Sequence, residues 1–440
     1  MQRMRRSYWF GDRSFYHMAL TVAVPIMIQN GITQFVGLLD NIMVGNVGTL
    51  PMSAVGIANQ LLLVYNLSIF GALGGAGIFG AQFYGKGDTD GVRESFRFKL
   101  IIAAILTAIG TAVFLLLDEP LISLYLQGEA TAADRAATLV YARQYLRIIL
   151  ISFVPFMLSQ SYSSTLRECG QTVVPMVAGI AGVAVNLVLN AILIYGLIGF
   201  PALGIEGAAI ATVVSRVVEA AIVMLWTHRH SAEQPFILGA YRSLRIPRAL
   251  LTEIVKKSMP LLINELLWSA GVAMESMAYS MHGLVVVSAQ AISSTISNVF
   301  NVAFMAMGSA IGIIVGQLLG AGRTGEAVET DRKLIVFAVL ICFGIGAVMY
   351  FVAPWIPMLY ATTEDVASLA TRLIRCAAVC MPLWSLGNAC YFTLRSGGKT
   401  FITFLFDSCF VWVICVPVAF GLTWWTDIEI VPLYLIVCAT

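Results

Sequence analysis

The sequence predicts an all-α polytopic membrane protein with twelve transmembrane helices in two pseudo-symmetric six-helix lobes. Three observations predict this fold. First, 59% of the 440 residues are hydrophobic and only 11% are charged, against about 25% charged in soluble domains, so most of the outer surface must face hydrocarbon. Second, the chain contains twelve long apolar runs. Third, its two halves repeat each other.

The apolar runs locate the predicted spans, because a transmembrane helix needs about 20 mostly apolar residues. The runs that we interpret as spans are 17–43, 53–81, 98–117, 141–165, 172–195, 204–227, 258–280, 287–316, 333–353, 367–393, 400–424 and 430 to the end. The last run stops at Thr440 after about half a span, so we expect the twelfth helix to be incomplete.

The basic residues predict the orientation. Alternate connecting segments, beginning with the N-terminus, hold 20 of the 26 Lys and Arg residues. Cytoplasmic loops collect such residues, so we expect a multi-pass protein of the cell (inner or plasma) membrane with a cytoplasmic N-terminus. The longest polar stretch divides the chain into an N-terminal lobe over 1–227, a cytoplasmic linker over 228–257 and a C-terminal lobe over 258–440.

The repeat is visible at nearly constant offsets. At 235 residues Pro25 aligns with Pro260, and further on, at 228, Thr165-Leu166-Arg167 aligns with Thr393-Leu394-Arg395. Six helices per half is an even number, so both halves insert the same way up. Transporters built from parallel repeats bind substrate between the halves and rock one against the other. The repeat therefore predicts a secondary transporter, because a channel or a receptor has less use for such a duplicated, hinged pair.

Ionisable side chains within spans are costly, and each is a functional candidate. The acids that qualify are Asp40, Glu219, Glu265, Glu275 and Asp407. Arg216 lies three residues before Glu219, so on a helix the two can pair, and we interpret that pair as structural.

Asp40 is the strongest candidate for an ion-binding or proton-binding residue. Asn186 and Asn190 are four apart and share one face of the fifth predicted helix, and Thr212 lies on the sixth. One carboxylate, two amides and a hydroxyl can supply oxygen ligands for Na⁺ or a polar shell for a proton-carrying acid. The alternative is a buried hydrogen-bond network that only holds helices together.

The repeat supplies an internal comparison. At the 228 offset, Asn186 and Asn190 align with Ile414 and Val418, so the second half lacks this polar pair. The asymmetry favours an ion site in the first half. Glu265, early in the seventh predicted helix, is a second-lobe candidate for proton exchange, and a purely structural acid is an equally good interpretation.

Other kinds of site find no support. The glycine-rich stretch from Gly71 to Gly77 lies inside an apolar span, where helix packing explains it better than phosphate binding. Neither a catalytic triad nor a metal-ligand constellation is present, and the eight cysteines lie singly. We expect no enzyme activity, no nucleic-acid partner and no cofactor beyond H⁺ or Na⁺ as coupling ion.

The chain contains several linked motifs: Leu39-Asp40-Asn41-Ile42-Met43-Val44-Gly45, Gln82-Phe83-Tyr84-Gly85-Lys86-Gly87, Leu166-Arg167-Glu168-Cys169-Gly170-Gln171-Thr172 and the run from Gly199 to Thr212. Together they resemble the motifs of the multidrug and toxic compound extrusion (MATE) transporters, and the resemblance covers essentially the whole chain. The resemblance implies two lobes around a V-shaped cavity, and export of mainly cationic, amphipathic compounds in exchange for H⁺ or Na⁺.

The resemblance also implies roles for particular residues. Asp40 matches the family's first-helix acid, with Asn186, Asn190 and Thr212 around it. Glu265 matches a seventh-helix acid that is used in one branch.

That branch also has an acid in the tenth helix. Residues 376–394 hold none here, so a second-lobe Na⁺ site is not implied. Gln29 and Asn264, which align in the repeat, are expected in the substrate cavity.

These observations together predict a monomeric multidrug antiporter that takes small organic cations within the lipid bilayer. The alternative is a flippase for a lipid-linked saccharide from a related branch of the superfamily. Cavities of that kind are lined with Arg or Lys to meet phosphate, whereas Arg216 is the only basic residue near the middle of a predicted span. The other basic residues of the spans lie nearer their ends: Lys99, Arg143, Arg147, Lys333, Arg372 and Arg375.

Overall fold

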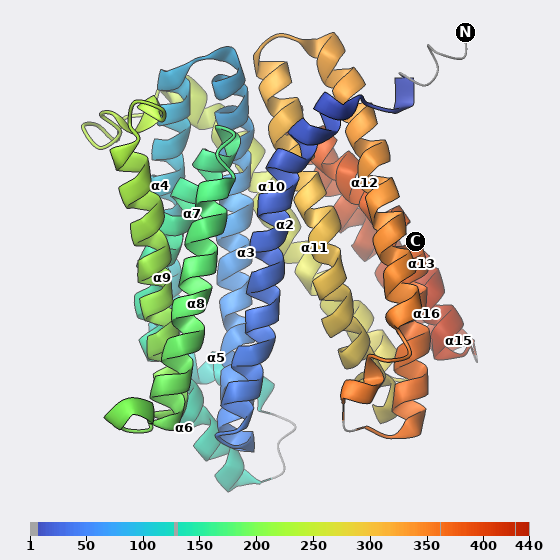
Figure 1. The fold of residues 1–440 in the computed structure, drawn as a ribbon. Coiled ribbons are helices and arrows are strands. Elements are labelled where there is room, and N and C mark those ends of the chain that lie inside the picture. Colours follow the sequence, from blue (N-terminus) through green and yellow to red (C-terminus); the bar gives the residue numbers. More distant parts are fainter. Residues whose placement is uncertain (1–7, 127–130, 361, 427, 440) are drawn as a thin grey trace. The chain divides into compact units, whose positions relative to one another are not determined.

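The computed structural model describes residues 8–126, 131–360, 362–426 and 428–439, and every regular element in them is helical (Figure 1). The helices of the first half are α2 (Arg13–Gly45), α3 (Thr49–Lys86), α4 (Thr89–Leu116), α5 (Asp118–Tyr125), α6 (Ala132–Ile149), α7 (Phe153–Glu168), α8 (Val173–Tyr195) and α9 (Gly204–Arg229). Those of the second half are α10 (Arg248–Ser280), α11 (Leu284–Gly320), α12 (Thr324–Val352), α13 (Glu364–Ser396), α14 (Thr400–Phe404), α15 (Val416–Trp425) and α16 (Ile430–Ala439).

Each of the twelve predicted spans is helical in the structure. Ten stretches of the described residues are long and apolar enough to cross a membrane, including α6 with α7 and the region from α14 to α15 as one span each. The other two predicted spans are α10, whose apolar part is interrupted by Glu265 and Glu275, and the ten-residue α16. The all-helical membrane fold is therefore confirmed.

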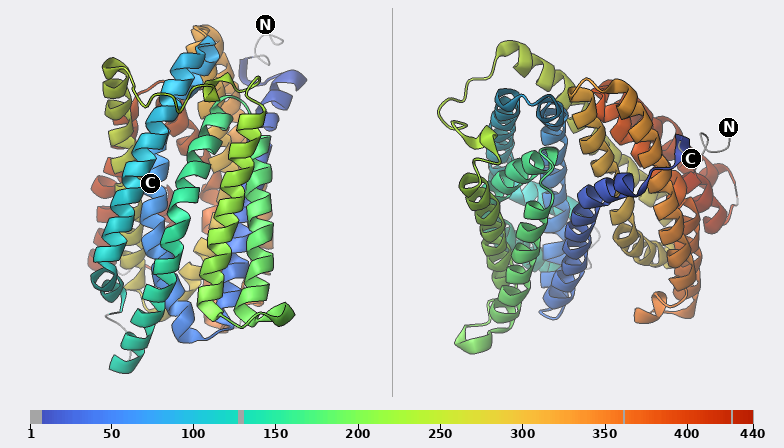
Figure 2. Two further views of the ribbon diagram at one scale, coloured as in Figure 1. Left: turned by 90° about the vertical axis from the view of Figure 1, so that its left-hand side faces the viewer. Right: turned by 45° about the horizontal axis from the view of Figure 1, so that its top comes forward.

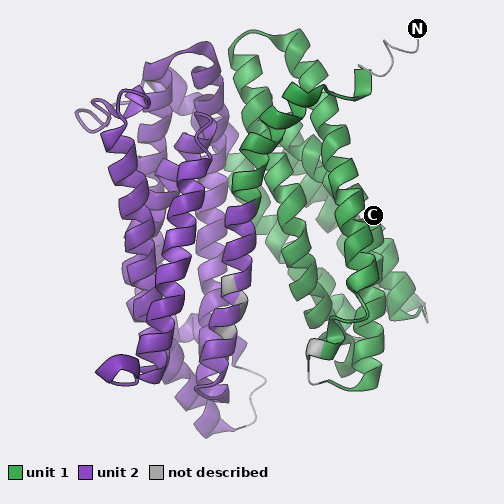
Figure 3. Ribbon diagram, in the orientation of Figure 1, with its two compact units in different colours: residues 1–27, 259–440 green, residues 28–258 purple. Residues whose placement is uncertain are grey.

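Packing divides the chain into two compact units, residues 1–27 with 259–440 (unit 1) and residues 28–258 (unit 2) (Figure 3). The divisions fall inside α2 and α10, two residues after Pro25 and two before Pro260. Proline inside a helix removes a hydrogen bond and favours a bend. By packing, the linker 228–257 belongs to unit 2, and the division drawn from the sequence repeat stays a prediction.

In unit 2 the helices run alongside one another, and the turn before α4 lies at the same end as the linker (Figures 1 and 2). Small residues bring α8 and α9 together, as the run from Gly207 to Thr212 predicts. A Cβ at Gly207 would lie 2.7 Å from the carbonyl of Leu193, so only glycine allows this approach. Elsewhere in the core the ring of Tyr65 stacks on Phe153 at 3.8 Å.

Unit 1 has its own core, formed by α10, α11, α12, α13, α15 and α16. Its eleventh predicted span is not a regular α-helix, because two π-helical turns, Leu405–Cys409 and Val411–Cys415, separate α14 from α15. Such turns are rare and often accompany functional sites. The first of them carries Asp407.

Candidate functional site

Asp40 lies near the end of α2 in unit 2 and is held by an amide from α8. The Asn190 Nδ2 donates to Asp40 Oδ1 at 2.6 Å. Asn190 is only 1% exposed, so this bond forms inside the lobe. A hydrogen bond to an ionised acceptor is shorter and stronger than one between neutral groups, and this distance is at the short end of the range. The predicted pairing of Asp40 with this helix is therefore present in the fold.

Asn186 and Thr212 complete the polar shell. Asn186 lies one helical turn before Asn190, and its Oδ1 accepts from Asn190 Nδ2 at 3.1 Å, while its Nδ2 donates to Thr212 Oγ1 at 3.3 Å. In the opposite amide orientation, Asn186 Nδ2 would lie 3.0 and 3.1 Å from the two Asp40 oxygens and Asn186 Oδ1 would accept from Thr212. In both orientations, one carboxylate, two amides and one hydroxyl meet at one place.

One acceptor of this shell has no partner. The Asn190 Oδ1 is buried and accepts no hydrogen bond from any described residue. A buried polar atom without a partner costs free energy, about 1–3 kcal/mol, unless a ligand, water or ion satisfies it. Next to a carboxylate, an orphan amide oxygen suits a hard cation or a protonated donor.

Two further side chains adjoin this shell. Tyr145, from α6, is buried against Thr212 and close to Asp40. Arg216 lies one turn after Thr212 on α9, close enough for its charge to act on Asp40. Tyr145 carries no signal in the sequence that marks it, because it comes from a helix far from the motif residues.

The predicted pair on α9 is confirmed. Arg216 Nη1 lies 2.9 Å from Glu219 Oε2, and Glu219 Oε1 accepts from Ser159 Oγ at 2.9 Å. The guanidinium also lies 5.2 Å from the ring centre of Phe156. Because Arg216 touches Glu219 and acts on Asp40, the pair belongs to the electrostatic surroundings of the site as well as to the packing.

Charged groups continue through unit 2 beyond this pair. Arg167 donates to Gln29 Oε1 at 2.6 Å. The fully buried Lys99 Nζ lies 2.6 Å from both carboxylate oxygens of Glu168 and 3.0 Å from Thr165 Oγ1. Sequence reasoning missed this second pair, because Lys99 lies at the very start of the predicted span 98–117 and Glu168 lies outside the predicted span 141–165.

The second lobe holds polar contacts of its own. Asn264 Nδ2 donates to Asp407 Oδ2 at 2.7 Å, and Ser408 Oγ donates to Asn264 Oδ1 at 2.8 Å. Tyr391 donates to Glu265 Oε1 at 3.4 Å, and the charge of Arg395 acts on Glu265. Ile414 and Val418 therefore show only that the second lobe lacks amides at the aligned positions. The lobe does contain an amide–carboxylate pair, but at other positions.

Gln29 and Asn264 are both buried, and each is bonded within its own unit, to Arg167 and to Asp407. Their expected place in a substrate cavity stays a prediction. No group of three or more His, Cys, Asp or Glu that could bind a metal occurs in the described part of the chain. Any cation site at Asp40 would thus rely on amide, hydroxyl and carboxylate oxygens together.

Long apolar helices with charged and amide groups enclosed among them define the protein as a polytopic membrane protein of the transporter class. The MatE family model matches residues 25–192 and 260–420. The chain therefore belongs to the MATE family of transporters, which are not enzymes.

Individual relatives agree with this assignment. The chain is 24% identical over 404 residues to the probable multidrug resistance protein NorM of Thermotoga maritima, covering 91% of this chain and 84% of NorM. It is 26% identical over 421 residues to the probable multidrug resistance protein YoeA of Bacillus subtilis, covering 92% and 87%.

The fold is shared with a solved structure of a MOP superfamily transporter from Pyrococcus furiosus. The TM-score is 0.86 at 21% identity, over 99% of this chain and 94% of the other. For that transporter, reverse polarity of the binding pocket is said to suggest a different function, so the fold by itself does not fix the cargo.

Proposed function

We propose that this protein is a multidrug efflux antiporter that exports small organic, mainly cationic and amphipathic compounds in exchange for H⁺ or Na⁺. The observation that carries the proposal is the contact of Asp40 with Asn190 beside an orphan amide oxygen. The names of the relatives support the choice of multidrug export over other transport.

In this mechanism Asp40 exchanges an ion for cargo. The deprotonated carboxylate, held by the Asn190 amide, favours the state that accepts a cation. Binding of H⁺ or Na⁺ removes that negative charge, and with Na⁺ the orphan oxygen of Asn190 and the hydroxyl of Thr212 provide further ligands. A ligand shifts an equilibrium only through different affinities for the two states, so ion and cargo must prefer opposite states.

The energy source is sufficient for such an exchange. Moving one elementary charge across 100 mV supplies about 2.3 kcal/mol. That amount corresponds to roughly a fiftyfold concentration ratio, because about 1.4 kcal/mol is tenfold, but only where the exchange moves one net charge, as with an uncharged cargo. One-for-one exchange of a monovalent cation moves no net charge, so the concentration gradient of the coupling ion drives its export, tenfold for a tenfold gradient.

The test is ethidium efflux from loaded cells of a drug-sensitive bacterial host without its own multidrug pumps. The wild-type chain is expected to export ethidium until an uncoupler or sodium removal stops it, and Asp40→Asn is expected to export none. The matched control is Asp407→Asn, which alters a carboxylate bonded to an amide in the other lobe. Undiminished efflux by Asp40→Asn would contradict the proposed role.

The same cells distinguish the flippase. A flippase for a lipid-linked saccharide would leave ethidium retention unchanged and would move a fluorescent phosphate-linked lipid across the bilayer. The basic residues enclosed in unit 2 speak against it, since Arg216 is paired with Glu219 and Lys99 with Glu168.

A further inference from the structure

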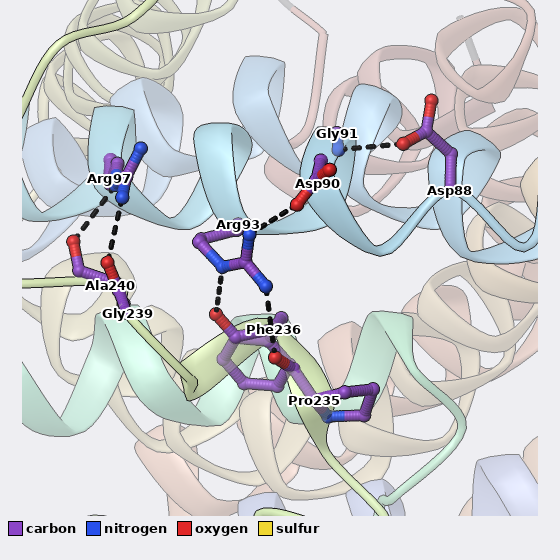
Figure 4. Close-up of polar contacts among 9 residues, drawn as sticks. All are labelled: Asp88, Asp90, Gly91, Arg93, Arg97, Pro235, Phe236, Gly239 and Ala240. Atoms are coloured by element: carbon purple, nitrogen blue, oxygen red, sulfur yellow. Dashed lines mark hydrogen bonds and ion pairs between the residues drawn. The ribbon is translucent and has the colours of Figure 1, made fainter. Parts of the chain in front are cut away.

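The linker between α9 and α10 is fixed to unit 2 by two arginines of α4 (Figure 4). Arg97 donates from Nε to the carbonyl of Ala240 and from Nη2 to that of Gly239, both at 2.8 Å. Arg93 Nε donates to the carbonyl of Phe236 at 3.2 Å. Hydrogen bonds from charged donors are strong, so these contacts hold the linker backbone in one place.

The inner side of the linker packs against unit 2 through aromatic side chains. Phe236 is 2% exposed, and its ring lies 5.4 Å from Phe96, which in turn contacts Tyr162 at 4.9 Å. The hydroxyl of Tyr241 is hydrogen-bonded to that of Tyr162. The linker is thus an ordered layer of unit 2, with one face buried and one face outward.

The outward face combines cations with apolar side chains. Arg242, Arg245 and Arg248 are exposed, and none forms an ion pair with any described residue. Leu238, which precedes the three arginines, is 55% exposed, and Leu244, which lies between Arg242 and Arg245, is 59% exposed. We call residues 238–248 the basic layer.

The basic layer contains no acid, and the acids nearest to it in sequence are Glu233 and Glu253. Glu253 pairs with Lys256 at 3.4 Å. The three arginines therefore keep an uncompensated charge.

The position of the basic layer relates these features to the bilayer. It joins the end of α9, a span, to the start of α10, so it lies where helices leave the membrane. At that depth, apolar side chains enter the headgroup region while arginines remain with the phosphates. Cytoplasmic leaflets are rich in anionic lipids, and basic segments beside spans are attracted to them.

We propose that the basic layer binds the headgroups of anionic phospholipids. Arg242, Arg245 and Arg248 meet the phosphates, Leu238 and Leu244 enter the interface, and the bonds from Arg93 and Arg97 keep the three cations in position. A guanidinium can bind a phosphate with two parallel hydrogen bonds, which suits arginine better than lysine at such a place.

The test measures lipid binding to the full chain in detergent. Native mass spectrometry follows dioleoylphosphatidylglycerol titrated onto the wild type, with dioleoylphosphatidylcholine as the neutral lipid. The expected result is preferential binding of the anionic lipid that weakens as salt rises. Each cation contributes about fivefold, so the triple variant R242Q/R245Q/R248Q is expected to bind it about a hundredfold more weakly.

Two control variants keep the test specific. The charge-retaining triple variant R242K/R245K/R248K is expected to keep most of the preference, and R135Q, which removes another exposed arginine of unit 2, is expected to keep all of it. Equal binding of both lipids by the wild type would overturn the proposal, and so would unchanged binding by the glutamine variant. Displacement of the lipid by millimolar inorganic phosphate, or tighter binding of an acidic peptide or RNA than of the lipid, would also overturn it.

Discussion

Replacing Asn190 with alanine tests the most specific contact of the candidate site. The wild-type amide donates to Asp40 at 2.6 Å, a bond that favours the charged carboxylate. A hydrogen bond to a charged group is worth about 1.5–3 kcal/mol. Since 1.36 kcal/mol corresponds to one pH unit, the variant is expected to need a pH about one to two units higher for half-maximal transport.

The sign follows from the mechanism. The bond that the variant lacks stabilises only the deprotonated carboxylate. Its loss therefore favours the protonated form of Asp40, and a higher pH is needed to remove the proton. The assay is ethidium transport by proteoliposomes over a range of pH under a fixed membrane potential. Maximal rate and thermal stability in detergent are recorded in parallel to detect misfolding.

The chain provides a matched control for this experiment. Asn264→Ala removes a comparable bond, 2.7 Å from amide to carboxylate, at Asp407 in the other lobe. It is expected to lower stability without moving the pH of half-maximal transport. An unmoved midpoint in Asn190→Ala, or equal shifts in both variants, would refute the assignment of proton exchange to the first lobe.

The remaining predictions concern the charged groups of unit 2. Arg216→Gln removes a positive charge near Asp40 and is expected to raise the pH of half-maximal transport. Glu219→Gln leaves the Arg216 charge without its partner and is expected to lower that pH. Shifts of both variants in the same direction would contradict this. Lys99→Met leaves Glu168 buried without its ion-pair partner and is expected to cost about 3–5 kcal/mol of stability, seen as a lower midpoint of thermal unfolding in detergent. Adding Glu168→Leu is expected to restore much of that loss, and no recovery would argue against the pair as its cause. Arg97→Gln releases the linker and is expected to speed trypsin cleavage within 238–248, and an unchanged cleavage rate would show that the linker is held by other contacts.

The helices could be predicted from the sequence because each apolar run is long enough to cross a bilayer. Their ends were less accessible: α4 begins at Thr89, nine residues before its apolar run, because a polar helical turn outside the hydrocarbon carries no apolar signal. The helix α5 was missed for a related reason, since its eight residues are too short to show a span.

Part of the candidate site followed from spacing and from the family resemblance. Asn186 and Asn190 lie one turn apart on α8, so their shared face could be predicted. The contact of Lys99 with Glu168 could not be predicted in this way, because it joins residues 69 positions apart and depends on how α4 packs against α7. The same limit hid Tyr145.

The second lobe shows where reasoning from the repeat is incomplete. Aligned positions Ile414 and Val418 are apolar, and the lobe nevertheless contains an amide–carboxylate pair at Asn264 and Asp407. The π-helical turn that carries Asp407 displaces side chains from the register that an alignment of regular helices assumes. Positions that align in the sequence repeat therefore do not make equivalent contacts in the two lobes.

The most direct measurement of the central claim is gradient-driven ethidium transport by purified protein in proteoliposomes, with pH and sodium gradients imposed separately. The wild type is expected to move ethidium under at least one of the two gradients, and Asp40→Asn, folded to the same thermal stability, under neither. Transport by Asp40→Asn at the wild-type rate under the same gradient would contradict the claim that this carboxylate exchanges the ion for the cargo.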